Sequence, residues 1–431
     1  MKILFCVEFY FPSMGGAQEV VRQIAERMVE FGHDVSIATS QIKSRTTLEL
    51  NGVQIEEFDV AGNFVRGFRG EVNKYRDFLV KSKFDLVFFY AAQQWTFDAA
   101  WQVIDSIPGK TVLVPCGYSG LYLPAYKTYF DELPNILRKI DGIVYHSKNY
   151  RDFEFANKNK IANGILIPNG ADEKEFLVTK DLEFRKEHGI DVDAIVLLTV
   201  GTFTGLKGHL ELAEAFKQAT FNGRNAILLL NGNTTPMGSN VTKLLYLPLI
   251  LKEYGLFKTT KLVLKSLLWA LGINISKTRP LKERIKKINK QLTKEKRIVI
   301  LDLPRPQLVQ AYLNADLFVF ASNVEYSPLV LFEACAAGLP FLSVPVGNSE
   351  EIADWTKSGE ICLADVDAQG YTRVNADKLA QKIEDLISNK AKLQELGRNG
   401  RLAWQIRYNW DSLAREYESF FIELIDASTM L

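Results

Sequence analysis

The chain has 431 residues, of which 47% are hydrophobic, and its 52 Lys and Arg balance 51 Asp and Glu to a net charge of +1. This length exceeds the ~250–300 residues at which a single hydrophobic core stops growing, so we expect two domains. The balanced charge argues against a general nucleic-acid binder, and four cysteines without a CxxC pair argue against a zinc or disulfide framework. No signal-peptide pattern or membrane-spanning apolar stretch is evident, which predicts a cytoplasmic protein.

The first part of the chain alternates strand and helix patterns. Residues 2–7 form a buried-strand run, and a turn with Gly15 and Gly16 leads into an amphipathic helix, with apolar positions between 20 and 28, that stops at Gly32. This alternation predicts a mostly parallel sheet, whose ligands bind outside the carboxyl ends of the strands. The two glycines would let a ligand approach the backbone there, although a plain tight turn explains either of them equally well. Further strand runs follow at 35–38, 53–58, 86–90, 111–114 and 142–145.

A second sheet is predicted beyond the segment 165–172, which reads as a strand followed by an Asn-Gly turn and marks the end of the first domain. The strand run 195–200 precedes a Gly-rich loop, GTFTGLKGH at 201–209, and an amphipathic helix from Leu210. Lys207 stands at the end of this loop, where its ammonium group would reach a phosphate as a point charge. The alternative is an ordinary solvated lysine.

A basic insert occupies residues 234–297, between the strand runs 226–230 and 298–301. It contains 15 Lys and Arg against 3 Glu, a local charge of +12 that leaves the rest of the chain at −11. Basic amphipathic helices with Leu and Trp are typical of segments that lie in the headgroup region of an anionic membrane. The alternative is a helical hairpin packed on its own domain. The apolar positions lie at 244–251, at 262–269 and in the stripe Leu281, Ile285, Ile288 and Leu292.

Residues 325–340, EYSPLVLFEACAAGLP, are the most informative stretch. They follow a buried-strand run, and Ser327-Pro328 begins a helix that ends at Gly338. The unpaired N–H groups at such a helix start bind anions, and carboxylates at 325 and 333 accept hydrogen bonds from sugar hydroxyls. A polyol linked to a diphosphate suits this combination, whereas the structural alternative is a loop Glu and a solvated helix Glu.

The Glu-x7-Glu spacing of Glu325 and Glu333, with Gly338-Leu339-Pro340 behind it, resembles the family 4 retaining glycosyltransferases of the GT-B fold. In that family the first Glu contacts the donor sugar, the second holds the nucleotide ribose, and backbone amides between them hold the diphosphate. The resemblance implies no metal ion and no cofactor. It implies catalytic roles for Glu325 and Lys207, and donor-binding roles for Gly15, Gly16, Thr202, Lys207, Pro328, Leu329, Val330 and Glu333.

Two positions depart from the family pattern. Cys116 stands where relatives commonly have a His that contacts the donor sugar, so we assign no catalytic His. Thr202 replaces an Arg that usually accompanies the loop Lys in binding the diphosphate. Arg305, in the loop after the strand run 298–301, is the candidate for the missing cation.

The resemblance implies an α/β protein of the GT-B fold, with two Rossmann-like, doubly wound domains facing a cleft. The acceptor domain is predicted at 1–175, and the nucleotide-sugar domain at 176–408 with the basic insert 234–297. A last helix over 410–425 is expected to cross back to the first domain, which would then include residues 409–431.

The predicted function is retaining transfer of a hexose from a UDP- or GDP-sugar to a glycan or polyprenyl-linked acceptor. The enzyme would act in cell-surface polysaccharide or glycolipid assembly, as a peripheral protein at the anionic inner face of the membrane. A nucleotide-sugar 2-epimerase is one alternative, although it needs acid/base residues and a His that the loop at Cys116 lacks. A non-catalytic membrane scaffold of the same fold is another, and would explain the departures at Cys116 and Thr202 together.

Overall fold

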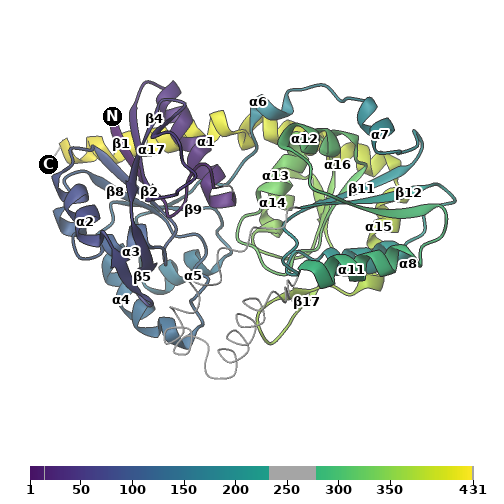
Figure 1. Cartoon of the computed structure of the whole chain (residues 1–431), viewed down its shortest axis with the longest axis horizontal. Coiled ribbons are helices and arrows are strands. Elements are labelled where there is room, and N and C mark those ends of the chain that lie inside the picture. The colour runs from purple at the N-terminus through teal and green to yellow at the C-terminus, as the bar shows by residue number, and fades with distance from the viewer. Residues whose placement is uncertain (14, 233–277, 430–431) are drawn as a thin grey trace. The chain divides into compact units, whose positions relative to one another are not determined.

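The computed structural model describes residues 1–13, 15–232 and 278–429 (Figure 1). The chain forms two compact units. Unit 1 contains residues 1–169 and 410–431, and unit 2 contains residues 170–409. The chain thus returns to unit 1 at Trp410, which confirms the predicted crossing helix.

Unit 1 is built on an eight-stranded sheet whose strands are parallel apart from the β3–β4 pair. The order is β10-β9-β8-β7-β1-β2-β4-β3, so the chain order reverses at β1, which lies between β2 and β7. Every strand run predicted in this part is confirmed, because buried parallel strands read as continuous apolar runs. The strands are β1 (Lys2–Cys6), β2 (Asp34–Ser40), β3 (Glu49–Leu50), β4 (Val53–Phe58), β7 (Leu86–Tyr90), β8 (Lys110–Val114), β9 (Gly142–Tyr145) and β10 (Gly164–Leu166), and a separate hairpin comprises β5 (Val60–Asn63) and β6 (Gly67–Gly70).

The C-terminal helix of the chain, α17, belongs to unit 1. Helix α17 packs against α1, and the His33 ring nitrogen Nε2 lies 2.7 Å from a carboxylate oxygen of Glu418 on α17. On the sheet, α2 and α3 pack against each other and enclose an aromatic core. The helices are α1 (Gly16–Glu30), α2 (Val72–Lys81), α3 (Trp95–Ala100), α4 (Lys127–Leu137), α5 (Arg151–Lys158) and α17 (Trp410–Thr429).

Unit 2 is built on a six-stranded parallel sheet in the order β13-β12-β11-β14-β15-β16. The chain order reverses between β11 and β14, which are hydrogen-bonded neighbours although a long stretch of chain separates them. Ligands of doubly wound sheets bind beside such a reversal. The strands are β11 (Ile195–Val200), β12 (Ala226–Asn231), β13 (Lys296–Leu301), β14 (Leu317–Phe320), β15 (Phe341–Ser343) and β16 (Gly359–Ile361), and a small hairpin comprises β17 (Asp365–Val366) and β18 (Thr372–Arg373).

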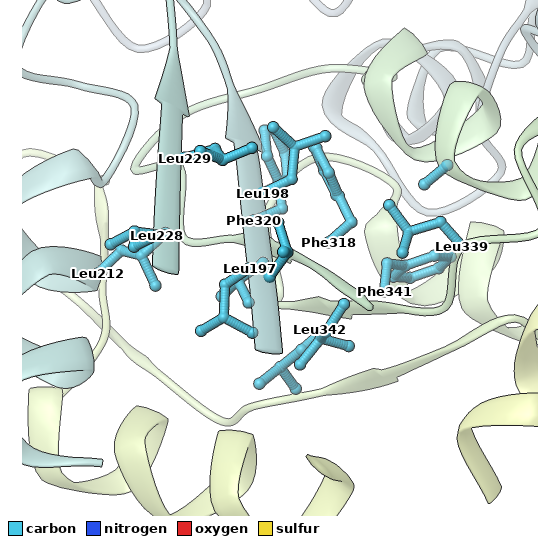
Figure 2. Packing of buried hydrophobic residues seen from close by; sticks show 14 of the residues in the cluster. Leu197, Leu198, Leu212, Leu228, Leu229, Phe318, Phe320, Leu339, Phe341 and Leu342 are labelled. Atoms are coloured by element: carbon cyan, nitrogen blue, oxygen red, sulfur yellow. The ribbon is translucent and has the colours of Figure 1, made fainter. Parts of the chain in front are cut away.

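Two groups of helices cover the sheet of unit 2 (Figure 1). Helices α8, α11 and α15 lie on one face, and α12, α13 and α16 lie on the other. Large apolar side chains from β11, β14 and β15 fill the space between sheet and helices (Figure 2), and each fully buried one contributes about 1.5–3 kcal/mol. The helices of this unit include α6 (Glu173–Phe176), α7 (Glu183–Glu187), α8 (His209–Gln218), α11 (Thr278–Asn289), α12 (Arg305–Asn314), α13 (Leu329–Ala336), α14 (Ser349–Thr356), α15 (Ala376–Ser388) and α16 (Lys390–Ala403).

The described part of the basic insert corrects one prediction. The apolar stripe of α11 is buried in the core of unit 2 against α8 and β13, with Leu292 partly buried beside it, so this stripe does not face a membrane. The patterns at 244–251 and 262–269 lie outside the described residues. Among the helices that the structure describes, none is long and apolar enough to cross a bilayer. The buried stripe residues are Leu281, Ile285 and Ile288.

Two acidic side chains, Glu8 and Asp98, are shielded from solvent near the C-terminal ends of the unit 1 strands. Asp98 is 2% exposed and accepts hydrogen bonds from the Phe64 and Gln93 amides and the Tyr129 hydroxyl. Glu8 is half-buried, and its carboxylate has no hydrogen bond or ion pair with the residues that the structure describes. Burial raises the pKa of both groups to about 7, although the positive charge of Arg66 lowers the pKa of Glu8 in part.

We predict that the contribution of Glu8 to stability falls as the pH rises from 5 to 8. The folded-state pKa of Glu8 lies above its ordinary value of 4.5, so the native state binds more protons than the unfolded chain across this range. Glu8→Gln removes the buried charge and should raise the free energy of unfolding by about 1–3 kcal/mol at pH 8, with almost no effect at pH 5. Urea unfolding at both pH values measures this. The exposed Glu56→Gln serves as the control, and an equal effect of Glu8→Gln at both pH values would contradict the prediction.

Candidate active site

Two loops of unit 2 meet at the carboxyl ends of β11 and β14, where the strand order reverses. Leu206, in the Gly-rich loop after β11, accepts a hydrogen bond at its carbonyl oxygen from the Asn323 amide (2.9 Å) after β14, and the Ser322 hydroxyl oxygen lies 3.2 Å from the same carbonyl oxygen. Gly208 has a φ of +68°, and a Cβ at this position would lie 1.8 Å from the carbonyl oxygen of Ala321. Only glycine therefore allows the two loops to pass so closely.

Lys207 and Glu325, predicted from separate motifs, are brought together by these loops. The Lys207 Nζ lies 2.6 Å from Glu325 Oε1, and the Ser322 hydroxyl donates to the same oxygen at 2.9 Å. The two charged side chains are 27% and 16% exposed. Because an ammonium group has three N–H donors, Lys207 can bind Glu325 and a phosphate at the same time.

Helix α13 begins directly after this pair. Pro328 is its N-cap residue, with φ −73° and ψ 114°, one position earlier than the predicted place inside the first turn. Leu329 and Val330 open the helix, and the N–H groups of a first turn have no acceptor within the helix. These groups and the helix dipole favour an anion at this end. Pro328 itself has no N–H and contributes only the backbone geometry.

Glu333 lies on the fifth residue of α13 and is only 8% exposed. Its Oε2 accepts a hydrogen bond from the Tyr312 hydroxyl at 2.8 Å, and its Oε1 lies 2.7 Å from a guanidinium nitrogen of Arg305. Arg305 also binds Glu175, through Nε at 2.9 Å. The structure therefore places Arg305, the candidate diphosphate cation, between two carboxylates.

Lys207 is the only Lys or Arg in the Gly-rich loop 201–209. Thr202 occupies the position of the family arginine and accepts a backbone hydrogen bond from the Thr204 amide at 2.7 Å. His209 is 2% exposed and stacks on Phe203 with 4.5 Å between ring centroids. Burial lowers the pKa of His209 to about 4, so this ring is neutral and does not supply the missing positive charge.

In unit 1, the predicted glycines lie at the start of α1. Gly15 is the N-cap residue with an extended φ of 179°, and Gly16 is the first residue of the helix. A Cβ at Gly16 would meet nothing within 4 Å, and one at Gly15 would meet only the Gln18 side chain. Among the described residues nothing requires glycine at position 16, and nothing fills the space beside its Cα.

The loops that follow β7 and β8 contain strained backbone, which no sequence pattern indicated. Four residues other than glycine have positive φ there: Ala91 (75°), Gln93 (66°), Cys116 (59°) and Tyr118 (46°). Such conformations cost free energy and gather at functional sites. Burial raises the pKa of the Cys116 thiol, which favours its protonated form.

Two known proteins are similar to this chain in sequence. N-acetyl-alpha-D-glucosaminyl L-malate synthase of Bacillus anthracis is 20% identical over 437 residues, which cover 99% of this chain and 98% of that protein. Spore coat protein SA of Bacillus subtilis (strain 168) is 30% identical over 122 residues, only 28% of this chain and 29% of that protein.

Solved structures show the fold. Sucrose-phosphate synthase from Thermosynechococcus elongatus superimposes with a TM-score of 0.73 at 18% identity, over 99% of both chains. Anabaena HepE in complex with UDP-glucose superimposes with a TM-score of 0.66 at 15% identity, over 100% of both chains. These neighbours confirm the predicted GT-B architecture.

The family model described as glycosyl transferases group 1 matches residues 180–403. This range is just over half of the chain and contains both loops of unit 2 that meet beside β11 and β14. The protein is therefore a transferase that belongs to the glycosyl transferases group 1 family.

Proposed function

We propose that this protein transfers a hexose from a UDP- or GDP-sugar to a glycan or polyprenyl-linked acceptor, with retention at the anomeric carbon. One observation carries the proposal: an ammonium group, a carboxylate and a helix N-terminus converge where the strand order of unit 2 reverses. These groups match a diphosphate joined to a sugar. The structures of Anabaena HepE with UDP and with UDP-glucose support a donor of this class.

Lys207 and the first turn of α13 would hold the diphosphate of the donor. As the bond to the anomeric carbon breaks, negative charge accumulates on the departing diphosphate, and donors already in place stabilise it without reorganisation. Glu325 would accept hydrogen bonds from hydroxyls of the hexose, while Ser322 and Lys207 keep its carboxylate in place. Glu333 would accept hydrogen bonds from the ribose.

The proton of the acceptor would pass to the departing diphosphate on the same face of the sugar. Three of the four histidines have partners outside the two loops: His33 contacts Glu418, His146 contacts the carbonyl oxygen of Ile167, and His188 packs on the Phe184 ring. His209, at the end of the Gly-rich loop, is buried against the Phe203 ring. Catalysis would then depend on positioning the two substrates and on stabilising the charge of the leaving group.

We assign the acceptor to unit 1 and the nucleotide sugar to unit 2, following the predicted division into 1–175 with 409–431 and 176–408. The open space beside Gly16 and the strained backbone at Gln93 and Cys116 support this assignment, because both lie at the carboxyl ends of the unit 1 strands.

We also place the enzyme in the cytoplasm at the inner membrane face, in cell-surface polysaccharide or glycolipid assembly. The +12 charge of residues 234–297 supports this placement, since each basic residue near an anionic surface contributes ~1 kcal/mol. In the described part, Lys286 and Lys287 are exposed on α11.

Incubation with a panel of UDP- and GDP-sugars, with and without acceptor, tests the function. Release of nucleotide that requires acceptor supports transfer, and the anomeric configuration of the product, read by NMR, tests retention. A change in the sugar without acceptor would instead indicate a 2-epimerase. Nucleotide-sugar binding without turnover would indicate a non-catalytic scaffold.

We predict different defects for the two charged residues. Lys207→Ala should lower turnover by about 10²–10³-fold and weaken nucleotide binding, because it removes a preorganised donor to the diphosphate. Glu325→Gln should lower turnover while nucleotide binding, measured by calorimetry, stays close to the wild-type value. Lys217→Ala on α8 and Glu350→Gln on α14 are charge-matched controls. Normal kinetics in both site variants would exclude these roles.

We predict that the intact protein co-sediments with vesicles containing anionic lipid, and that salt weakens the interaction. Changing the insert lysines to Glu should release most of the protein from the vesicles, whereas changing Lys81 and Lys83 in unit 1 to Glu should not. Absent binding, or binding that neither reversal nor salt alters, would remove the membrane placement. The insert lysines to be changed to Glu are Lys258, Lys261, Lys265, Lys286 and Lys287.

A further inference from the structure

Four side chains from α6, α12 and α13 form a hydrogen-bonded group, which we call the Glu333 cluster. Glu175 comes from α6, Arg305 and Tyr312 come from α12, and Glu333 comes from α13. Arg305 joins the two carboxylates, at 2.9 Å from Glu175 and 2.7 Å from Glu333, and the Tyr312 hydroxyl completes the cluster. None of these contacts is local in sequence.

The cluster fixes the carboxylate of Glu333 from two directions. Tyr312 holds Oε2 and Arg305 holds Oε1, so the carboxyl plane cannot rotate without breaking a hydrogen bond. Tyr312 is itself 1% exposed and stacks on Phe318 of β14 with 5.4 Å between ring centroids. The hydroxyl is therefore anchored to the central sheet, and its position is set by the core.

Arg305 contacts an aromatic ring and two carboxylates. Its guanidinium lies 5.8 Å from the centre of the Phe176 ring and contacts carboxylates on two sides. Burial alone would lower the pKa of Arg305, but Glu333 and Glu175 more than reverse this, so the group stays charged. One guanidinium is thus shared by two carboxylates, through its Nε and Nη2 groups.

A carboxylate oxygen has two lone pairs, so each oxygen of Glu333 can accept one hydrogen bond from the cluster and another from a ligand. An oriented carboxylate of this kind matches a pair of neighbouring hydroxyl groups better than a phosphate, whose negative charge it would repel. The two neighbouring hydroxyls of a ribose satisfy this requirement.

We propose that Arg305 and Tyr312 are positioning residues that lock Glu333 for the ribose hydroxyls of the donor. Arg305, the first residue of α12, therefore does not replace the diphosphate cation absent at Thr202, and Lys207 acts without it. The inference rests on the proposed function, because it requires a nucleotide at Glu333.

The test combines changes in the protein with changes in the ligand. The probes are UDP or GDP, whichever the wild-type protein binds more tightly, the 2′,3′-dideoxy form of the same nucleotide, and inorganic pyrophosphate. Titration calorimetry gives the affinity of each probe for the wild type, Tyr312→Phe, Arg305→Lys and Glu175→Gln. Gln307→Ala, an exposed change on α12, is the matched control. Lys207→Ala shows how the loss of a proposed diphosphate contact affects the affinity for each probe.

We predict that Tyr312→Phe weakens the ribose-containing nucleotide by about 3–10-fold, the equivalent of one hydrogen bond, and Arg305→Lys by at least as much. The same variants should bind the dideoxy nucleotide and pyrophosphate within about twofold of the wild-type affinity. Glu175→Gln, which leaves the Arg305–Glu333 contact in place, should have a smaller effect. Lys207→Ala should weaken all three probes.

Tyr312→Phe keeps the stacked ring, so its far-UV circular dichroism and melting temperature verify that it folds. Equal losses for the nucleotide and its dideoxy form would overturn the inference, and added loss for pyrophosphate would make Arg305 a diphosphate ligand. In either case the proposed function would stand. Failure of the wild-type protein to bind UDP or GDP would instead overturn the proposed function, and the inference with it.

Discussion

The half-buried contact between the Lys207 ammonium and the Glu325 carboxylate, 2.6 Å apart, is the interaction on which the site of unit 2 depends. It exists because β11 and β14 are neighbours, and because Gly208 allows the loops behind them to touch. Such a pair adds little to stability, since the cost of taking both charges out of water offsets their attraction. Its value lies in geometry: a cation for phosphate and an acceptor for hydroxyls are held side by side.

Much of the fold follows from patterns visible in the sequence, because buried parallel strands appear as apolar runs and the Gly-rich turns between them are recognisable. The β5–β6 hairpin was missed: its strands, Val60–Asn63 and Gly67–Gly70, are short and rich in glycine. The stripe of α11 was read as a membrane face although Leu281 and Ile285 are buried. An apolar stripe has the same period whether a core or a membrane covers it.

The candidate site was predictable only where its residues belong to motifs. Glu325, Glu333 and Lys207 have a characteristic spacing or loop, whereas Tyr312 stands in an ordinary helix pattern and its contact with Glu333 arises from the packing of α12 on α13. Nothing in the sequence indicated that carboxylates from two other elements flank Arg305, the candidate phosphate ligand. The strained backbone at Gln93 and Cys116 has no sequence signature, because neither residue type is typical of positive φ.

The central claim, that the nucleotide diphosphate of the donor binds where the strand order of unit 2 reverses, is tested most directly by hydrogen–deuterium exchange of the intact protein with and without saturating UDP or GDP. The account predicts slower exchange in peptides from the Gly-rich loop 201–209 and from 326–332 at the start of α13. Peptides from α2, which belongs to unit 1, should not change. Unchanged exchange in both loops, with protection elsewhere in unit 2, would contradict it.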